Sequence, residues 1–183
     1  GVRTRLLAKG GGKWAETAGE NAKFGLSTAE LLEAGEMLKA ENLGHCLKLL
    51  HFHIGSQVPD ILTIKKAVQE ASRFYAKLYQ MGFQIEYLDV GGGLGVDYDG
   101  SRSAFDSSTN YSLQEYTNDI VYYIADVCNA EKVPHPDIIS ESGRAIVAHH
   151  SVLIVEVFGS IEKNRLHSNL QYGENEHPLV REL

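Results

Sequence analysis

The residues best suited to chemistry lie in the segment Asp89–Gly95, which reads DVGGGLG and directly follows an apolar run. Three consecutive glycines leave no Cβ in the way, so their backbone N–H groups can approach an anion such as a phosphate. A tight turn at the end of a strand uses the same residues and is the plainer alternative. A dinucleotide fingerprint is disfavoured, because Val96 stands where the last glycine of G-x-G-x-x-G is required.

The sequence HFHIGS, residues 51–56, places two histidines two positions apart. In an extended strand this spacing puts His51 and His53 on the same face. His53 precedes the turn at Gly55 and is therefore placed to contact a ligand, whereas a buried core histidine is the alternative. A metal site is not predicted, because no third ligand has a fitting spacing.

The sequence ESGR, residues 141–144, combines an acid with an arginine at the end of another apolar run. Glu141 could hold a proton on a ring nitrogen, and Arg144 beside Gly143 suits a phosphate. A Glu–Arg pair on the surface is the alternative. Together the three segments offer an aromatic ring, a phosphate cradle and a carboxylate, which are the complementary needs of an aromatic, cationic cofactor that carries a phosphate.

Strands and helices that alternate along the chain would position these segments. Helices are predicted from Ser27, over residues 61–80, and from Ser112 to about residue 131. Ser27 and Ser112 each begin a capping box with the glutamate three residues later. Strands are predicted over residues 2–8, 47–54, 85–90, 137–141 and 152–158. The repeated strand–helix order indicates a parallel sheet. Periodicity alone leaves an open sheet and part of a barrel as alternatives, since a closed eight-stranded barrel needs roughly 200 residues or more.

The overall composition excludes several classes of protein. The 183 residues carry a net charge of −7, without the basic footprint of a nucleic-acid-binding protein. The longest apolar runs are far shorter than the roughly 20 residues that cross a membrane. Cys46 and Cys128 form no metal-binding or disulfide pattern, so free thiols in a reducing cytoplasm are expected. Gly1 stands in place of an initiator Met, and the chain is expected to be an internal piece of a longer protein.

Four segments, in this order, resemble one known family. They are KFGL (Lys23–Leu26), HFHIGSQ (His51–Gln57), DVGGGLGVDYDGSR (Asp89–Arg102) and ESGRAIVAHH (Glu141–His150). The family is that of the barrel-type pyridoxal-phosphate decarboxylases for ornithine, diaminopimelate and arginine, and DYDGSR with the AHH ending favours the arginine branch. The resemblance implies an α/β fold, an incomplete (β/α)8 TIM barrel of the alanine-racemase-like type over residues 1–158. Residues 159–183 would begin a helical insertion or a following domain.

The resemblance also implies roles for the residues at matching positions. His53 would stack on the pyridoxal ring and Glu141 would keep the ring nitrogen protonated, so these two are the predicted catalytic residues. The other predicted cofactor-binding residues are Ser56, Gly91, Gly92, Gly93, Gly143 and Arg144. The predicted substrate-binding residues are Leu88, Asp89, Val90, Gly95, Val96, Asp97 and Tyr98. Lys23 resembles a family lysine near the dimer interface.

The implied activity is the decarboxylation of L-arginine to agmatine and CO₂, the first step of a polyamine biosynthetic route. The implied cofactor is pyridoxal 5′-phosphate, with Mg²⁺ as a further family expectation, and the implied partners are an amino-acid substrate and a second copy of the enzyme, with no nucleic acid and no membrane. The family's Schiff-base lysine and cross-dimer cysteine fall outside this chain, so the chain alone is predicted to be inactive. Three alternatives stay open: ornithine or diaminopimelate as substrate, a non-catalytic barrel that binds pyridoxal phosphate, and an unrelated phosphate-binding α/β module.

Overall fold

The fold of the first part of the chain is built on one parallel sheet. The structure, a computed structural model, describes residues 1–8 and 22–161 and divides the chain into two compact units, Gly1–His150 and Ser151–Leu183. In the first unit four parallel strands follow one another in chain order: β1 (Val2–Arg3), β2 (Leu49–His51), β3 (Tyr87–Asp89) and β4 (Asp137–Ile139). The predicted parallel sheet is confirmed, and its order without reversal is that of a (β/α) barrel rather than a doubly wound sheet.

The helices between the strands follow the sequence signals closely. They are α1 (Thr28–Ala40), the 3-10 helix η2 (Gly44–Cys46), α2 (Ile61–Gln80), α3 (Leu113–Glu131) and α4 (Gly143–Val147). Both predicted capping boxes are present at the N-termini of α1 and α3. The predicted range of α2 is confirmed, and the chain leaves this helix through Gly82 in the left-handed region, with φ of +95°.

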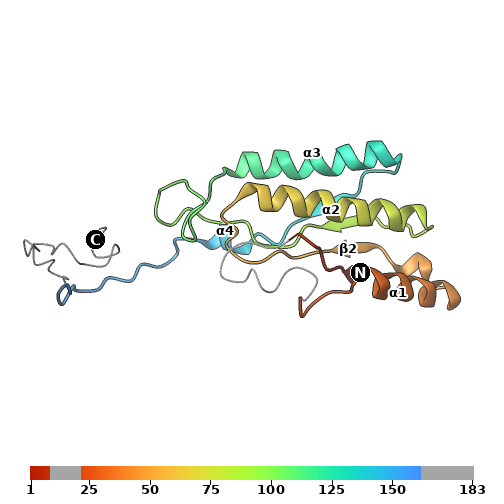
Figure 1. The fold of residues 1–183 in the computed structure, drawn as a ribbon, viewed down its shortest axis with the longest axis horizontal. Helices are drawn as coiled ribbons and strands as arrows, with labels where there is room; N and C mark the ends of the chain where they lie inside the picture. The colour runs from red at the N-terminus through yellow and green to blue at the C-terminus, as the bar shows by residue number, and fades with distance from the viewer. Residues whose placement is uncertain (9–21, 162–183) are drawn as a thin grey trace, which may run out of the picture. The chain divides into compact units, whose positions relative to one another are not determined.

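The core lies between the sheet and α2 and α3, which lie side by side (Figure 1). Leu50 in β2 and Leu88 in β3 are fully buried. On α2, the apolar side chains of Ile64, Val68, Ala71, Tyr75 and Leu78 are buried. On α1, Leu31 is buried whereas Leu32 and Met37 are exposed.

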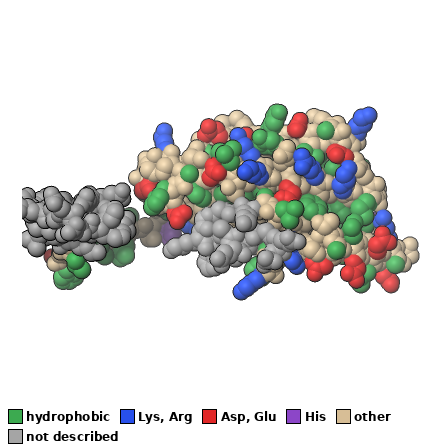
Figure 2. Space-filling model, in the orientation of Figure 1, with side chains coloured by type: hydrophobic (Ala, Val, Ile, Leu, Met, Phe, Trp, Pro, Cys, Tyr) green, Lys and Arg blue, Asp and Glu red, His purple; other side chains and the backbone are tan. Residues whose placement is uncertain are grey.

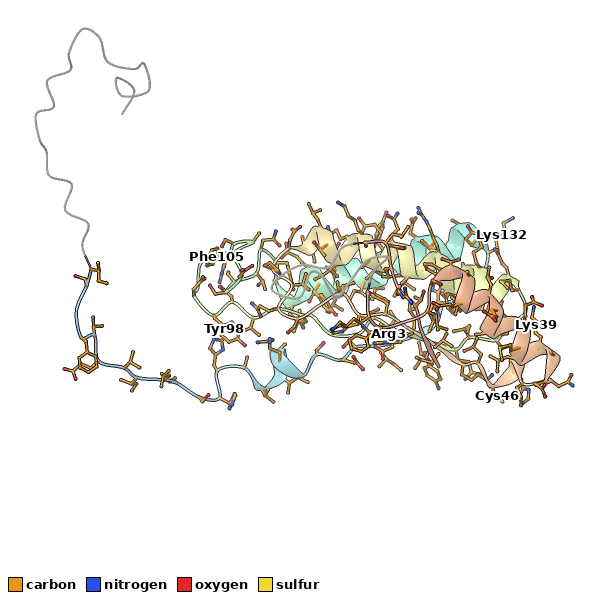
Figure 3. The ribbon with its side chains drawn as sticks, turned by 60° about the horizontal axis from the view of Figure 1, so that its bottom comes forward. Arg3, Lys39, Cys46, Tyr98, Phe105 and Lys132 are labelled. Atoms are coloured by element: carbon orange, nitrogen blue, oxygen red, sulfur yellow. The ribbon has the colours of Figure 1, made fainter. Side chains whose placement is uncertain are left out.

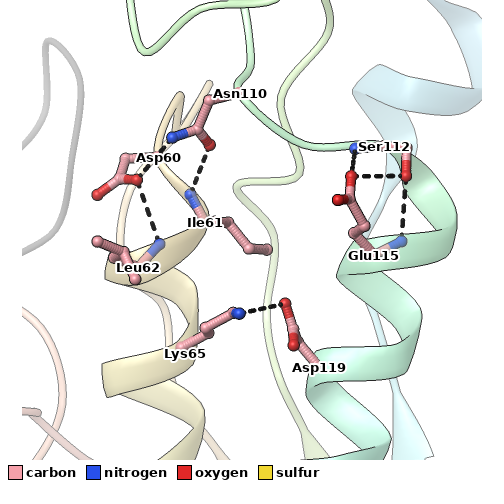
Figure 4. A network of polar contacts seen from close by, with 8 residues as sticks. All are labelled: Asp60, Ile61, Leu62, Lys65, Asn110, Ser112, Glu115 and Asp119. Atoms are coloured by element: carbon pink, nitrogen blue, oxygen red, sulfur yellow. Dashed lines mark hydrogen bonds and ion pairs between the residues drawn. The ribbon is translucent and has the colours of Figure 1, made fainter.

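A polar network fixes the ends at which α2 and α3 begin (Figure 4). Asn110 donates a hydrogen bond to Asp60, the N-cap of α2, at 2.9 Å, and accepts one from the backbone N–H of Ile61 at 3.0 Å. Lys65 and Asp119 join the two helices by an ion pair of 3.1 Å. The long segment between β3 and α3 is therefore held against the start of α2.

The carboxyl ends of the strands and the N-termini of the helices that follow them lie at the same end of the first unit. The C-termini of the helices lie at the opposite end. Figure 3 shows Tyr98 and Phe105, both in the segment after β3, at one end. Lys39, Cys46 and Lys132, which lie late in or after helices, are at the other end in the same view. Figure 2 shows acidic and basic side chains interspersed over the face that it draws, without a large patch of one sign.

Two sequence predictions need correction. The regular strands have only two or three residues, because hydrogen bonding beyond them passes to bridges and turns such as Thr4–Leu26 and Val58–Leu94. The predicted strand at residues 152–158 is wrong: these residues form no strand, and their apolar side chains are 70–100% exposed. A strand needs a neighbour for its backbone hydrogen bonds, and nothing in the described part of Ser151–Leu183 provides one.

The boundary predicted after residue 158 stays a prediction, and most of 159–183 lies outside the described residues. Among the helices that the structure describes, none has the length and apolar character needed to cross a membrane.

Candidate functional site

Charged residues from neighbouring strands line up at the carboxyl ends of the sheet. In the strand register Arg3 pairs with His51, and His51 pairs with Asp89. Asp89 in turn pairs with Ile139, and Glu141 lies two residues beyond Ile139. Residues two apart share a face of a strand, so the four strands bring an arginine, an imidazole and two carboxylates to one region.

The imidazole of His51 lies close to both carboxylates. The donor atoms of His51, Asp89 and Glu141 lie within 4.8 Å of one another, and His51 Nε2 is 3.7 Å from Glu141 Oε2. That nitrogen is buried and has no hydrogen-bond partner among the described residues. The group is wider than a tetrahedral zinc site, whose bond lengths put ligand atoms about 3.3 Å apart, and its imidazole suits magnesium poorly.

Electrostatics in this region also involve the residues on either side. Burial lowers the pKa of Arg3, and the charge of Glu141 partly opposes that shift. Burial also lowers the pKa of His53, with Arg3 and His51 adding to the effect and the two carboxylates opposing it. His53 is therefore a neutral ring at neutral pH, and its Nδ1 accepts a hydrogen bond from the backbone N–H of Gly92 at 3.3 Å.

The glycine run meets the ends of β2 and β4. Gly91 has a φ of +67°, and a Cβ built there would overlap the carbonyl of Phe52. Its own carbonyl accepts a hydrogen bond from the backbone N–H of Glu141 at 2.8 Å. A Cβ on Gly92 would lie 3.1 Å from the carbonyl oxygen of Glu141 and 3.3 Å from Cε1 of His53. The run thus serves as a tight turn at Gly91 and packs closely against His53 and Glu141 at Gly92.

Arg144 joins two other predicted site residues. Its guanidinium donates to Ser56 Oγ at 2.9 Å and to the hydroxyl of Tyr98 at 3.0 Å. Among the described residues it forms no ion pair with Glu141, so the surface Glu–Arg pair considered from sequence is absent. Gly143 directly precedes Arg144 as the first residue of α4, and a Cβ there would meet nothing within 4 Å.

The predicted substrate segment divides between core and loop. Leu88 and Val90 are buried in the core, and Asp89 accepts a hydrogen bond from the backbone N–H of Gly91 at 2.8 Å. Asp97 is occupied within its loop, where it accepts from Ser108 Oγ at 2.6 Å.

Two contacts that sequence reasoning missed hold this segment in place. Gln57 bonds both ways with the backbone of Val96, at 2.9 and 2.7 Å. The hydroxyl of Tyr111 accepts from the backbone N–H of Gly95 and donates to the carbonyl of Val58. Arg3 was missed as well, and His51 was noticed only for its shared face with His53. The alternation Val2-Arg3-Thr4-Arg5 indicates that Arg3 lies on one face of a strand. The residues around Arg3 do not predict the strand register that pairs it with His51.

Comparison with known proteins identifies the family. The model of the pyridoxal-dependent decarboxylases, pyridoxal binding domain, matches residues 2–148. The chain belongs to this family. Over its whole length it is 52% identical to the biosynthetic arginine decarboxylase of Phocaeicola vulgatus and 50% identical to that of Bacteroides thetaiotaomicron. It spans 29% of the length of each of these relatives.

Solved structures of relatives support the barrel. The biosynthetic arginine decarboxylase of Campylobacter jejuni is 36% identical with a TM-score of 0.66, over 78% of this chain and 22% of that one. The diaminopimelate decarboxylase of Helicobacter pylori, complexed with L-lysine, is 26% identical with a TM-score of 0.59, over 79% of this chain and 34% of that one. The four parallel strands and their helices are therefore part of an alanine-racemase-like (β/α) barrel, as predicted.

Proposed function

We propose that the protein to which this chain belongs decarboxylates L-arginine to agmatine and CO₂ with pyridoxal phosphate, and so supplies polyamine synthesis. The observation that carries the substrate is the identity of about half of all residues, over the whole chain, with arginine decarboxylases. The observation that carries the chemistry is the meeting of Glu141, His53 and the glycine run at adjacent strand ends.

The phosphate of the cofactor fits between the glycine run and Arg144. Gly92 carries no Cβ and its backbone N–H donates to His53 Nδ1 at 3.3 Å, so the glycine run lies directly beside the predicted stacking ring. Arg144 and Ser56 are already in contact at 2.9 Å, so a guanidinium and a hydroxyl would bind the same anion. Gly91, Gly93 and Gly143 would let the backbone approach it closely.

The ring of the cofactor fits between His53 and Glu141. A neutral imidazole offers a flat face for stacking on a cationic ring, and the lowered pKa of His53 keeps the imidazole neutral. Glu141, whose side chain is 56% exposed, would pair with the ring nitrogen and hold its proton. When bound, the protonated ring supplies an electron sink for the bond that breaks as CO₂ leaves. The chain's own residues bind the phosphate, orient the ring and retain that proton.

The remaining expectations concern the substrate, the assembly and the metal. The substrate would lie along residues 88–98, where Tyr98 contacts Arg144. The whole protein would be a dimer-based cytoplasmic enzyme. The Schiff-base lysine and the cross-dimer cysteine would come from other parts of the protein. A role for Mg²⁺ finds no suitable site among the described residues, where the one candidate group of ligands contains an imidazole.

Release of CO₂ from carboxyl-labelled arginine, ornithine and diaminopimelate by the full-length protein tests the proposal. We expect release from arginine at a kcat/KM at least tenfold above the other two. Faster release from ornithine or diaminopimelate would reassign the substrate. Pyridoxal phosphate that binds without any CO₂ release would favour the non-catalytic barrel, and absence of binding would favour an unrelated phosphate module.

A further inference from the structure

We propose that His51 is a positioning residue for Glu141: it donates a hydrogen bond from Nε2 to one carboxylate oxygen and leaves the other oxygen for the ring nitrogen of the cofactor. The proposal rests on the proposed function, since it assigns His51 to the same site. His51 would touch neither substrate nor cofactor, and it would act only through Glu141.

The contact geometry of His51 Nε2 is that of a hydrogen-bond donor whose acceptor lies slightly too far away. Within the described part of the chain, His51 Nε2 is buried without a hydrogen-bond partner, although buried polar groups nearly always have one. Its nearest charged acceptor is Glu141 Oε2 at 3.7 Å, slightly longer than a hydrogen bond. Such contacts are often long before a ligand binds and shorten in the complex. A small movement of the half-exposed Glu141 side chain would close this one.

Among the described residues, Glu141 is the carboxylate that comes within ion-pair distance of His51. Asp89, the other carboxylate nearby, already accepts from the backbone N–H of Gly91 at 2.8 Å. Arg3, the register partner on the other side, is a donor and cannot accept. An Nε2–H between the two carboxylates also reduces their mutual repulsion.

His51 and His53 have different tasks although they share a strand face. His53 directs its Nδ1 to the backbone N–H of Gly92 and lies beside the glycine run. His51 lies one pair of residues earlier, in register with Arg3 and Asp89, and faces Glu141. The strand thus places the imidazole of His53 beside the cofactor ring and the imidazole of His51 beside Glu141, the acid that pairs with the ring nitrogen.

Three substitutions in the full-length protein separate a positioning role from a structural one. Gln places its side-chain N–H₂ near the position of Nε2, whereas Leu has similar bulk and no donor, so His51→Gln should preserve what His51→Leu loses. The first readout is the ¹⁵N chemical shift of the ring nitrogen in bound, ¹⁵N-labelled pyridoxal phosphate, which reports its protonation. The second is kcat on arginine, and the third is the cofactor Kd. His45→Leu, at an exposed histidine of η2, is the matched control.

For His51→Leu we expect loss of part of the protonated ¹⁵N signal, a kcat about tenfold lower and a cofactor Kd within about threefold of wild type, because the phosphate contacts remain. His51→Gln and His45→Leu should keep the wild-type signal and kcat. In the Glu141→Ala background, His51→Leu should cause no further loss, since a residue that acts through Glu141 has nothing left to position.

Several results would overturn the proposal. One is a wild-type ¹⁵N shift and kcat in His51→Leu, and another is an equal further loss in the Glu141→Ala background. If His51→Leu fails to fold, His51→Asn, whose shorter side chain holds its N–H₂ away from the Nε2 position, replaces it, and equal behaviour of the Asn and Gln variants would refute the role. A wild-type protein that binds pyridoxal phosphate but leaves arginine intact would refute the proposed function alone, because the ¹⁵N comparison would still test His51.

Discussion

Gly91 and Gly92 are adjacent, yet the structure gives them different tasks, and alanine at each position separates the turn from the packing against His53. Gly91 has a positive φ and its Cβ would overlap the backbone carbonyl of Phe52. Gly92 has an ordinary φ, and its Cβ would touch the Glu141 carbonyl at 3.1 Å and His53 Cε1 at 3.3 Å. Gly91→Ala should therefore damage folding, whereas Gly92→Ala should damage cofactor binding.

The magnitudes follow from these contacts. Gly91→Ala combines a left-handed backbone at about 1–2 kcal/mol with an overlap at about 1–3 kcal/mol, so it should lower the free energy of unfolding by about 2–5 kcal/mol. For Gly92→Ala a shift of a few tenths of an ångström relieves the contacts, and the folded state should lose about 1 kcal/mol or less. A Cβ on Gly92 would, however, press on the ring of His53 at 3.3 Å, and a misplaced stacking contact of about 0.5–1.5 kcal/mol corresponds to about 2–10-fold in the cofactor Kd.

Urea unfolding of the full-length apo-protein and titration with pyridoxal phosphate measure the two effects. Gly44→Ala is the matched control, because its Cβ would make only ordinary contacts with Phe83 and Lys39 at 3.7 Å or more. The reasoning is refuted if Gly92→Ala binds the cofactor as tightly as wild type while folding normally. It is equally refuted if Gly91→Ala unfolds at the same urea concentration as Gly44→Ala.

Other predictions follow from single side chains. Glu141→Ala should lower kcat about 100-fold or more in steady-state assays while much of the cofactor stays bound, because a developing charge loses its support; near-normal turnover would remove Glu141 from the mechanism. Arg144→Ala should instead raise the cofactor Kd about tenfold or more, measured by absorbance titration, since an Arg–phosphate contact is lost; an unchanged Kd would contradict this. Burial raises the pKa of Cys128 to about 11, so iodoacetamide at pH 8 should alkylate the exposed Cys46 and leave Cys128 unmodified in peptide maps of the folded protein. Burial lowers the pKa of His53, so the unfolded state binds that proton more readily and stability falls as pH drops below about 6.5. His53→Gln should flatten that part of the pH dependence in urea titrations between pH 5 and 8, and an unchanged slope would rule it out.

Sequence reasoning succeeded where the signal is local. The capping boxes at Ser27 and Ser112 consist of residues three positions apart, so their geometry is independent of the rest of the fold. The placement of His53 and Glu141 at strand ends followed from apolar runs that stop at glycine-rich turns, and the structure brings both to the glycine run.

It failed where a residue's surroundings come from distant chain. Nothing near Arg3 in sequence indicates that His51 is its neighbour, because strand register is decided by pairing across more than forty residues of intervening chain. Residues 152–158 illustrate the opposite error, since their β-branched, apolar composition is typical of a strand but supplies no partner. The regular strands came out shorter than their apolar runs for a related reason, because hydrogen bonding beyond His51 and Asp89 goes to turns rather than to ladders.

The same alternation that builds the core also builds the site, and this couples folding to chemistry. In β2 and its extension, Leu50 and Phe52 are buried while His51 and His53 turn to the other face. In β3 and the residue after it, Leu88 and Val90 are both buried, and Asp89 lies between them in the sequence. A slip of one residue in the register would move every one of these side chains to the wrong face. It would place imidazoles in the core and leucines at the glycine run, so the burial that stabilises the sheet also selects the register in which Asp89, His51 and Glu141 meet.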